Sequence, residues 1–198
     1  MPGKITIKKS KPTMIPYVVQ GSTLQEIWTD IQAKGPTDDG KSRAGYTKAD
    51  VTTPASYDFD GKVKPNKGKG VMDVEVWIKT GTFDLTADIK IPKLKSDKDL
   101  SPAARKEWAR FMKELLSHEM EHVAATEKEA RKFADEMLKL KGKGSDADKE
   151  KAKQLAAENF SAEQAKKHSN AEFKKRLKAA NKALDSSGHG PVLKTSIP

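Results

Sequence analysis

A long amphipathic helix is the feature that most constrains how this chain can fold. Between Ser101 and Lys141, apolar side chains recur at intervals of three and four residues, at Trp108, Phe111, Met112, Leu115, Ala125, Ala130, Phe133 and Met137. Ser101 offers an N-cap hydroxyl, and Pro102 suits the first helical position because its ring fixes φ near the helical value. Gly142 and Gly144 would end the helix. The spacing therefore predicts a helix over residues 101–141.

The same apolar stripe carries polar residues with the spacing of a metal site, His118-Glu119-Met120-Glu121-His122. His118 and His122 are one helical turn apart, so both imidazoles project from one face and can bind one zinc ion at ~2.0–2.1 Å. Glu119 lies beside them and could take a proton from an activated water. The pattern predicts that His118 and His122 are zinc ligands and that Glu119 is the catalytic base of a metallopeptidase. The alternative is an exposed helix turn of ordinary polar residues.

A third ligand has to come from another segment, because Glu129 lies ~10 Å along a straight helix from His122. The candidates are His189, His168, Asp185 and Glu158. His189 is favoured, since it follows a predicted helix and is flanked by glycines that let the chain fold back onto the site.

Strict alternation of apolar and polar residues predicts two strands, over residues 72–78 and 83–91. Thr80 and Gly81 lie where a hairpin turn would be expected, and Pro92 would end the second strand. We expect this hairpin to supply a sheet that packs on the long helix.

Weaker patterns predict the remaining elements. Before the hairpin they indicate strands at 4–8, 14–20, 45–53 and 57–59, a helix that begins in a capping box at Ser22 and Gln25 and stops at Gly35 and Pro36, and a loop over 61–70. After the long helix they indicate further helices from Ser145 onward, with breaks at Ser161 or Ser169, and a tail after Pro191.

Composition limits the chemistry and the partners. The chain has no cysteine, so a metal must be held by His, Asp or Glu. Its formal net charge is +10, but the lysines are spread over predicted helix faces and loops, as on a solvated surface. Nucleic-acid binding is therefore not favoured. That alternative would predict an affinity for DNA or RNA that falls steeply as the salt concentration rises. A non-catalytic, lysine-rich helical binding or scaffold protein that keeps the fold is the main alternative to an enzyme.

The residue pattern also gives expectations about location. Residues 1–9 contain no apolar stretch of signal-peptide length, and no segment approaches the ~20 apolar residues of a membrane span. We expect a soluble chain that is cytoplasmic as synthesised.

Several segments together resemble a bacterial family of predicted secreted zinc-dependent proteases, catalogued as a domain of unknown function. The matching features, in order over residues 17–190, are Tyr17-Val18-Val19-Gln20-Gly21, a helix stop at Gly35-Pro36, a strand end at Pro92, the Trp108 helix with its His-Glu-x-x-His segment, and Asn181-Lys182-Ala183-Leu184-Asp185-Ser186-Ser187-Gly188-His189-Gly190.

The resemblance implies zinc binding by His118 and His122, with Glu119 as the base and His189 as the third ligand. It gives Asp185 the role of a partner behind a metal-bound histidine, with Asp185 and His168 as alternative ligands. The chain departs from the family in having Leu184 where an aromatic residue is preferred, and in lacking cysteines and a signal peptide. An exported effector or toxin, carried by a leaderless secretion or injection apparatus, is compatible with these departures.

The combined prediction is an α+β fold of zincin type. It would be a single metallopeptidase domain over residues 1–198, with a sheet-rich half at 1–100, a helical half at 101–190 and a tail at 191–198. A small antiparallel or mixed sheet would pack on the long helix, and an edge strand would hold a peptide or protein substrate by strand addition. An oxyanion stabiliser is expected among His168, Tyr17, Tyr46 and Tyr57.

Overall fold

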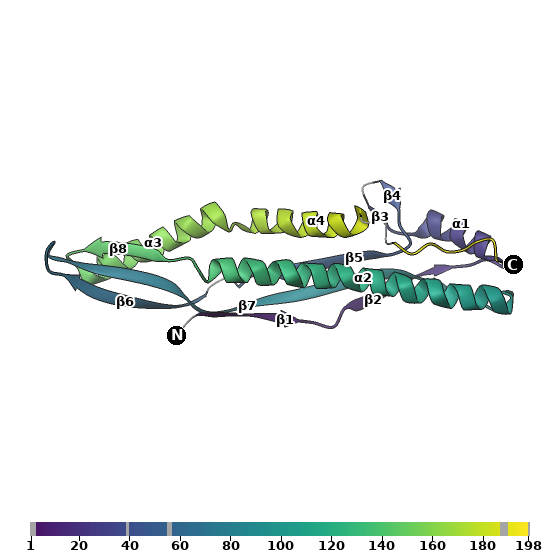
Figure 1. The fold of residues 1–198 in the computed structure, drawn as a ribbon, viewed down its shortest axis with the longest axis horizontal. Helices are drawn as coiled ribbons and strands as arrows, with labels where there is room; N and C mark the ends of the chain where they lie inside the picture. Colours follow the sequence, from purple (N-terminus) through teal and green to yellow (C-terminus); the bar gives the residue numbers. More distant parts are fainter. Residues whose placement is uncertain (1–2, 39, 55–56, 187–189, 198) are drawn as a thin grey trace. The chain divides into compact units, whose positions relative to one another are not determined.

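The chain folds as an α+β protein in a computed structural model that describes residues 3–38, 40–54, 57–186 and 190–197 (Figure 1). The elements in chain order are β1 (Lys4–Lys9), β2 (Thr13–Val19), α1 (Leu24–Lys34), β3 (Thr37–Asp38), β4 (Lys41–Ser42), β5 (Tyr46–Thr52), β6 (Asp58–Asn66), β7 (Val71–Leu94), α2 (Pro102–Met137), β8 (Gly142–Asp146), α3 (Lys149–Lys167) and α4 (Asn170–Ser186). The predicted α+β class and the mixed sheet are thus confirmed.

The chain divides into two compact units, each assembled from three separate segments. Unit 1 comprises Met1–Lys9, Val51–Leu85 and Glu127–Ala180, and unit 2 comprises Ser10–Asp50, Thr86–Thr126 and Asn181–Pro198. The prediction of a single domain stays a prediction.

β7 is the central strand of the sheet. In unit 1, β1 pairs with it in parallel over Thr80 to Leu85, and β6 and β8 pair with it in antiparallel fashion. In unit 2, β2 pairs with it in parallel from Asp88 to Leu94. β5 also pairs with β7, and β3 and β4 form a separate two-stranded sheet.

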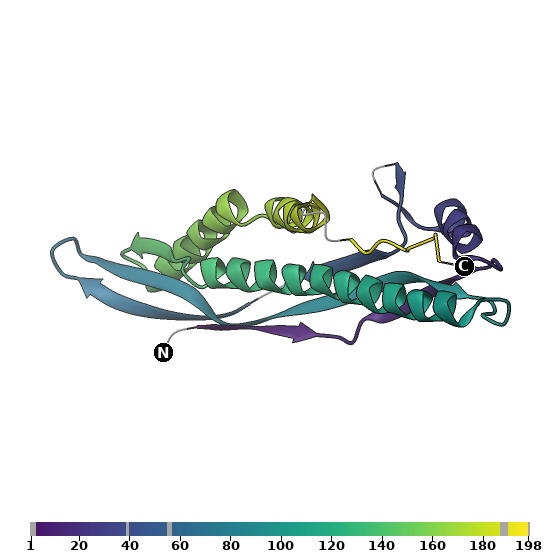
Figure 2. The same cartoon turned by 45° about the vertical axis from the view of Figure 1, so that its right-hand side comes forward.

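The predicted hairpin is wrong, because β7 is one continuous strand of 24 residues. The ribbon in Figure 2 shows no turn within it. Thr80 pairs with Asp58 and Ile78 pairs with Phe59, so Lys79 is an extra residue on β7 at this point. Such a bulge shifts the alternation by one residue. Buried positions are therefore even-numbered before it, as at Ile78, and odd-numbered after it, as at Phe83. The sequence shows the same parity change that two strands around a turn would show.

The loop predicted over residues 61–70 is also wrong for most of its length. β6 continues to Asn66, and only the turn at residues 67–70 separates it from β7. This lysine-rich and glycine-rich segment has few side chains suited to a strand. Its antiparallel pairing with β7 provides hydrogen-bond partners for its backbone N–H and C=O groups. Gly70 adopts a φ of 65°, which favours glycine.

The predicted helical half contains one strand that the sequence analysis did not predict. α2 ends at Met137 and not at Lys141, and β8 follows at Gly142. The next helix, α3, is capped by Asp148, which accepts hydrogen bonds from the backbone of Glu150 and Lys151. α3 runs through Ser161 without a break.

α4 begins after the second of the two predicted helix breaks. The hydroxyl of Ser169 accepts a hydrogen bond from the backbone of Glu172 at 3.2 Å. The predicted N-cap at Ser169 is confirmed.

Helix α1 and the first half of α2 share the core of unit 2. Thr23, one residue later than predicted, caps α1 by accepting from Glu26 N, and the Glu26 carboxylate accepts from Ser22 N at 2.7 Å. The buried members of the core are Val19, Leu24, Ile27, Ile31, Leu100, Ala104, Phe111, Leu115 and Leu193. Because the stripe of α2 is buried here, the rotation of α2 about its axis is fixed.

The last described residues pack on the same core. Leu193 is buried, the backbone of Lys194 donates to Glu107 at 2.9 Å, and Arg110 donates to the Val192 carbonyl at 2.8 Å. Hydrogen bonds from Arg110 lower the pKa of the Glu107 carboxyl to about 2. Residues 192–194 are therefore held against the first turns of α2.

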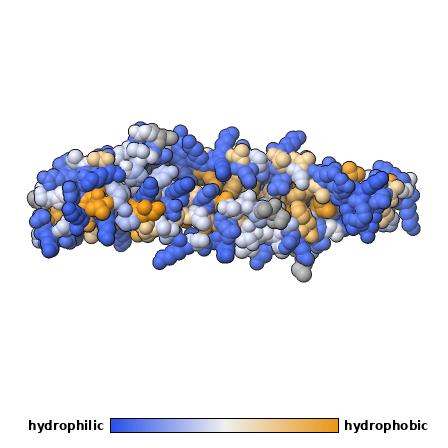
Figure 3. Space-filling model, turned by 180° about the vertical axis from the view of Figure 1, so that it is seen from behind, coloured by the Kyte–Doolittle hydropathy of each residue, from blue (hydrophilic) through white to orange (hydrophobic). Residues whose placement is uncertain are grey.

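The surface is mainly hydrophilic on the face drawn in Figure 3, where hydrophobic side chains form small separate groups. None of the helices in the described ranges combines the length and the apolar character that crossing a membrane requires.

Candidate metal centre

α2 presents the two histidines of the predicted motif on one side, within unit 2. Their ring centroids are 4.9 Å apart and the rings are nearly perpendicular. The rotation of α2 is set by its buried stripe, which includes Phe111, Leu115 and Val123. His122 is 8% exposed, so a polar ring lies where a helix of this kind usually buries apolar side chains.

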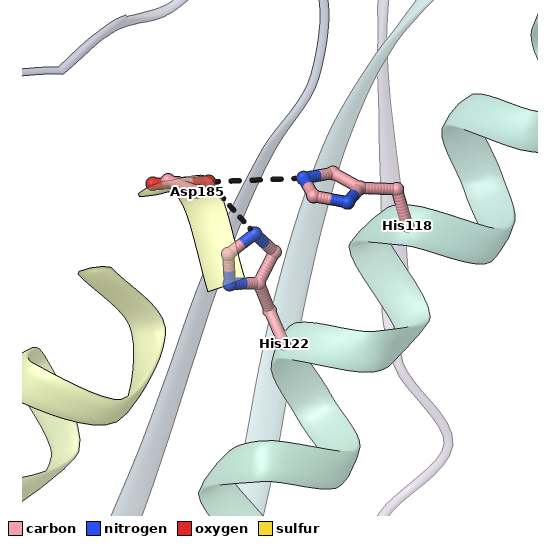
Figure 4. A group of neighbouring side chains, drawn as sticks. All are labelled: His118, His122 and Asp185. Atoms are coloured by element: carbon pink, nitrogen blue, oxygen red, sulfur yellow. Dashed lines mark ion pairs between the residues drawn. The ribbon is translucent and has the colours of Figure 1, made fainter. Parts of the chain in front are cut away.

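α4 brings a carboxylate to the two rings. Oδ1 of Asp185, in the last turn of α4, lies 3.2 Å from His122 Nε2 and 3.7 Å from His118 Nε2 (Figure 4). In the part of the chain that the structure describes, these three side chains form the group that could hold a metal ion, and one ligand atom from each lies within 4.8 Å of the others.

The hydrogen bonds behind the rings indicate which nitrogen faces the carboxylate. His122 Nδ1 is 3.0 Å from Oδ1 of Asn181, and because an amide oxygen only accepts, Nδ1 carries the proton. In the neutral ring Nε2 then has a free lone pair that points at Asp185. Nδ1 of His118 is buried and has no hydrogen-bond partner among the described residues.

The donor set fits a divalent cation. A ring nitrogen with a lone pair and a carboxylate oxygen repel each other at 3.2 Å unless a second ring proton or a metal ion lies between them. Two ligand atoms on a tetrahedral zinc ion with bonds of ~2.0–2.1 Å are about 3.3–3.4 Å apart. The two Nε2–Oδ1 separations lie on either side of this value. Two imidazoles and one carboxylate are a ligand set that zinc accepts.

Glu119 lies beside the group without belonging to it. The residue is 3% exposed, and Thr47 donates to Oε2 of its carboxylate at 2.7 Å. Burial raises the pKa of the Glu119 carboxyl, while the Thr47 hydrogen bond and the nearby histidines act in the opposite direction. A buried carboxyl with a raised pKa next to potential metal ligands is suited to accepting and returning a proton.

Three further residues reach the site from residues 43–47, the stretch that ends in the first residues of β5, and the sequence analysis did not name any of them as site residues. Thr47 contacts Glu119, Gly45 lies against the Glu119 carboxylate, and the Arg43 guanidinium is 3.9 Å from Oδ2 of Asp185. The predicted strand at 45–53 covers part of this stretch, but no local pattern marks these residues as part of a site, and only the contacts of the folded chain identify them.

The other predicted ligands are His189, His168 and Glu158. His189 is outside the described residues. His168 follows α3 in unit 1, with Nδ1 3.5 Å from Glu136 and its ring against Phe133, and burial lowers its pKa. Glu158 accepts a hydrogen bond from Gln154 on α3. Neither His168 nor Glu158 belongs to the group that could hold a metal ion.

The tyrosines proposed as oxyanion stabilisers have separate surroundings. The Tyr17 hydroxyl donates to the Ala44 carbonyl at 2.7 Å, and burial raises its pKa. Tyr57 belongs to unit 1, packs on Gly81, and has a pKa raised by burial to about 12. Tyr46 is half-buried at the start of β5. An oxyanion role for any of them stays a prediction.

Comparison with known proteins identifies the family of the chain. A family model described as "Bacterial protein of unknown function (DUF922)" matches residues 15–190. The chain belongs to this DUF922 family. No curated protein and no solved structure matches it. The stretch matched to the DUF922 family contains the two histidines of α2, Glu119 and Asp185.

Proposed function

We propose that this DUF922 protein is a zinc-dependent metallopeptidase. The observation that carries the proposal is the convergence of His118, His122 and Asp185, from two helices, beside a buried glutamate one residue after the first histidine. His118 and His122 would hold the ion through Nε2, and Asp185 through Oδ1. Bound zinc supplies a Lewis acid that polarises a carbonyl and acidifies water.

Glu119 is the proposed general base. Its carboxylate would take the proton of the attacking water and pass it to the leaving amine of the cleaved peptide bond. Because the side chain is buried and held by Thr47, it would not need to reorganise during proton transfer. The substrate would be a peptide or protein held in extended form along an edge of the sheet.

Metal analysis and one isosteric substitution test this function. The purified chain should contain about one zinc per molecule, and H118A, H122A or D185A should lose it, because each removes a ligand. Glu119→Gln should keep the metal and abolish cleavage of a peptide library, since the amide cannot accept the proton. The matched control is Glu121→Gln, which changes the exposed glutamate two positions along the same helix.

Two results would contradict the proposal. Failure of the wild-type chain to bind zinc would remove the metal site, and full cleavage by the Glu119→Gln variant would remove the base. Zinc binding without cleavage of any peptide by the wild type would favour a binding protein that uses the metal only to hold its fold.

A further inference from the structure

Residues 43–47, which run from the end of β4 into the start of β5, line one side of the site and belong to neither α2 nor α4. The alternate residues Arg43, Gly45 and Thr47 each contact one of the groups described above. The segment is fastened from behind, because the Tyr17 hydroxyl donates to the Ala44 carbonyl at 2.7 Å. This hydrogen bond holds the backbone between Arg43 and Gly45 in position beside the site.

Thr47 and Gly45 together define where both oxygens of the Glu119 carboxylate lie. The Thr47 hydroxyl is 2.7 Å from Oε2 and 3.1 Å from the Glu119 backbone carbonyl. Oε1 lies against Gly45 so closely that a Cβ there would be 2.3 Å away. Oε2 is thus held by the Thr47 hydroxyl, and Oε1 occupies the space that a side chain at position 45 would fill.

Arg43 acts on the other side of the site. Its guanidinium is 3.9 Å from Oδ2 of Asp185, whereas Oδ1 of the same carboxylate faces the two histidines. Asp38 is 3.8 Å from the guanidinium and helps to hold it. A positive charge at Oδ2 favours the rotamer that turns Oδ1 towards the rings.

We propose that Arg43, Gly45 and Thr47 are positioning residues, with Arg43 orienting the metal ligand Asp185 and Gly45 and Thr47 orienting Glu119. This inference rests on the proposed function and assigns metal affinity and reaction rate to different positioning residues. Arg43 governs how tightly the metal is held. Thr47 and Gly45 govern how fast the bound substrate reacts.

The test separates these effects with two variants of each polar residue. Thr47→Val removes the hydroxyl at nearly constant volume and should lower kcat roughly 10- to 100-fold with little change in KM, because a small displacement of a catalytic group has effects of this size. Zinc affinity should not change. Thr47→Ser should restore most of kcat, since it restores the donor.

The arm for Arg43 is read without catalysis. Arg43→Ala should weaken zinc binding about 10- to 100-fold in a competition titration with a chromogenic chelator, and Arg43→Lys should recover part of the loss. Lys48→Ala is the matched control for both arms, since Lys48 is an exposed neighbour on β5. Thermal unfolding of the metal-free variants should stay near that of the wild type.

The possible failures are distinguishable. If the wild type cleaves peptides but Thr47→Val has wild-type kcat, or Thr47→Ser fails to rescue it, the role of Thr47 is wrong while the peptidase stands. Unchanged zinc affinity in Arg43→Ala overturns the role of Arg43. A wild type that binds zinc and cleaves nothing removes the proposed function, and the chelator titration still decides the role of Arg43.

Discussion

At the scale of single residues, Asn181 determines which ring nitrogen of His122 faces the candidate metal site. Its amide oxygen accepts from Nδ1 of His122 at 3.0 Å, so the ring presents Nε2 to Asp185. Metal-bound histidines commonly use the second ring nitrogen in this way, and the partner fixes both the tautomer and the ring orientation. Asn181 therefore belongs to the site although it cannot reach the ion itself.

Replacement of Asn181 by alanine should weaken zinc binding about 10- to 100-fold, because the ring of His122 can then rotate and exchange tautomers. Competition titration with a chelator measures the effect. Lys182→Ala, at the exposed neighbouring position, is the control and should bind zinc like the wild type. Equal affinities for the two variants would show that His122 needs no partner.

Sequence spacing was sufficient for some residues of the site and not for others. His118, Glu119 and His122 follow from helical periodicity, because residues one turn apart share a face whatever surrounds them. The pairing of Thr47 with Glu119 spans 72 residues, and periodicity contains no information on such contacts. Asp185 was named as a candidate ligand, but only the fold shows that its carboxylate reaches both rings.

At the scale of elements, glycines determine how β8 packs on α3. A Cβ on Gly142 would lie 1.9 Å from the Ala156 carbonyl oxygen, and one on Gly144 would lie 2.2 Å from that of Ala152. The opposing atoms belong to a helix backbone and cannot move aside as a side chain can. The two glycines that the sequence analysis interpreted as helix breakers are therefore needed for close contact.

Gly142→Ala should lower the free energy of unfolding by more than the ~1–3 kcal/mol usual for an overpacked core, since the clash is with backbone. Urea unfolding monitored by circular dichroism measures this. Gly68→Ala is the matched control, because a Cβ there meets only Asn66 Oδ1 at 3.8 Å. Similar stabilities of the two variants would mean that β8 and α3 separate without cost.

The elements with complete local signals were predicted most accurately. α1 and α2 have both an apolar stripe and capping residues, and each begins within two residues of its predicted start. β7 was predicted as a hairpin because a bulge and a turn give the same change of parity in sequence. Only the pairing of Asp58 with Thr80 distinguishes the two, and it depends on a strand that itself was predicted only in part.

At the scale of the whole molecule, the candidate metal site joins the three segments that form unit 2. Arg43 and Thr47 come from the first segment, the α2 residues from the second, and Asn181 and Asp185 from the third. A ligand that binds only the folded form stabilises what it joins, by about 2.7 kcal/mol when its concentration is 100 times the dissociation constant.

Zinc removal should therefore loosen unit 2 selectively. After treatment with a chelator, amide hydrogen exchange should accelerate in residues 10–50, 86–126 and 181–186, and much less in 57–85 and 127–180. The His118→Ala variant should show no further change on chelation. An equal rise in exchange over both sets of residues would contradict the assignment of the ion to unit 2.

The two helices that meet at the candidate site each contribute a pair of residues one turn apart, His118 with His122 and Asn181 with Asp185. Since each inserted residue turns a helix by about 100°, one added or deleted position between Asn181 and Asp185 would aim the carboxylate away from the rings. Relatives of this protein should therefore tolerate changes in length between their helices and almost none inside these turns. In an alignment of the family, insertions and deletions should therefore be absent between residues that must share one helical face.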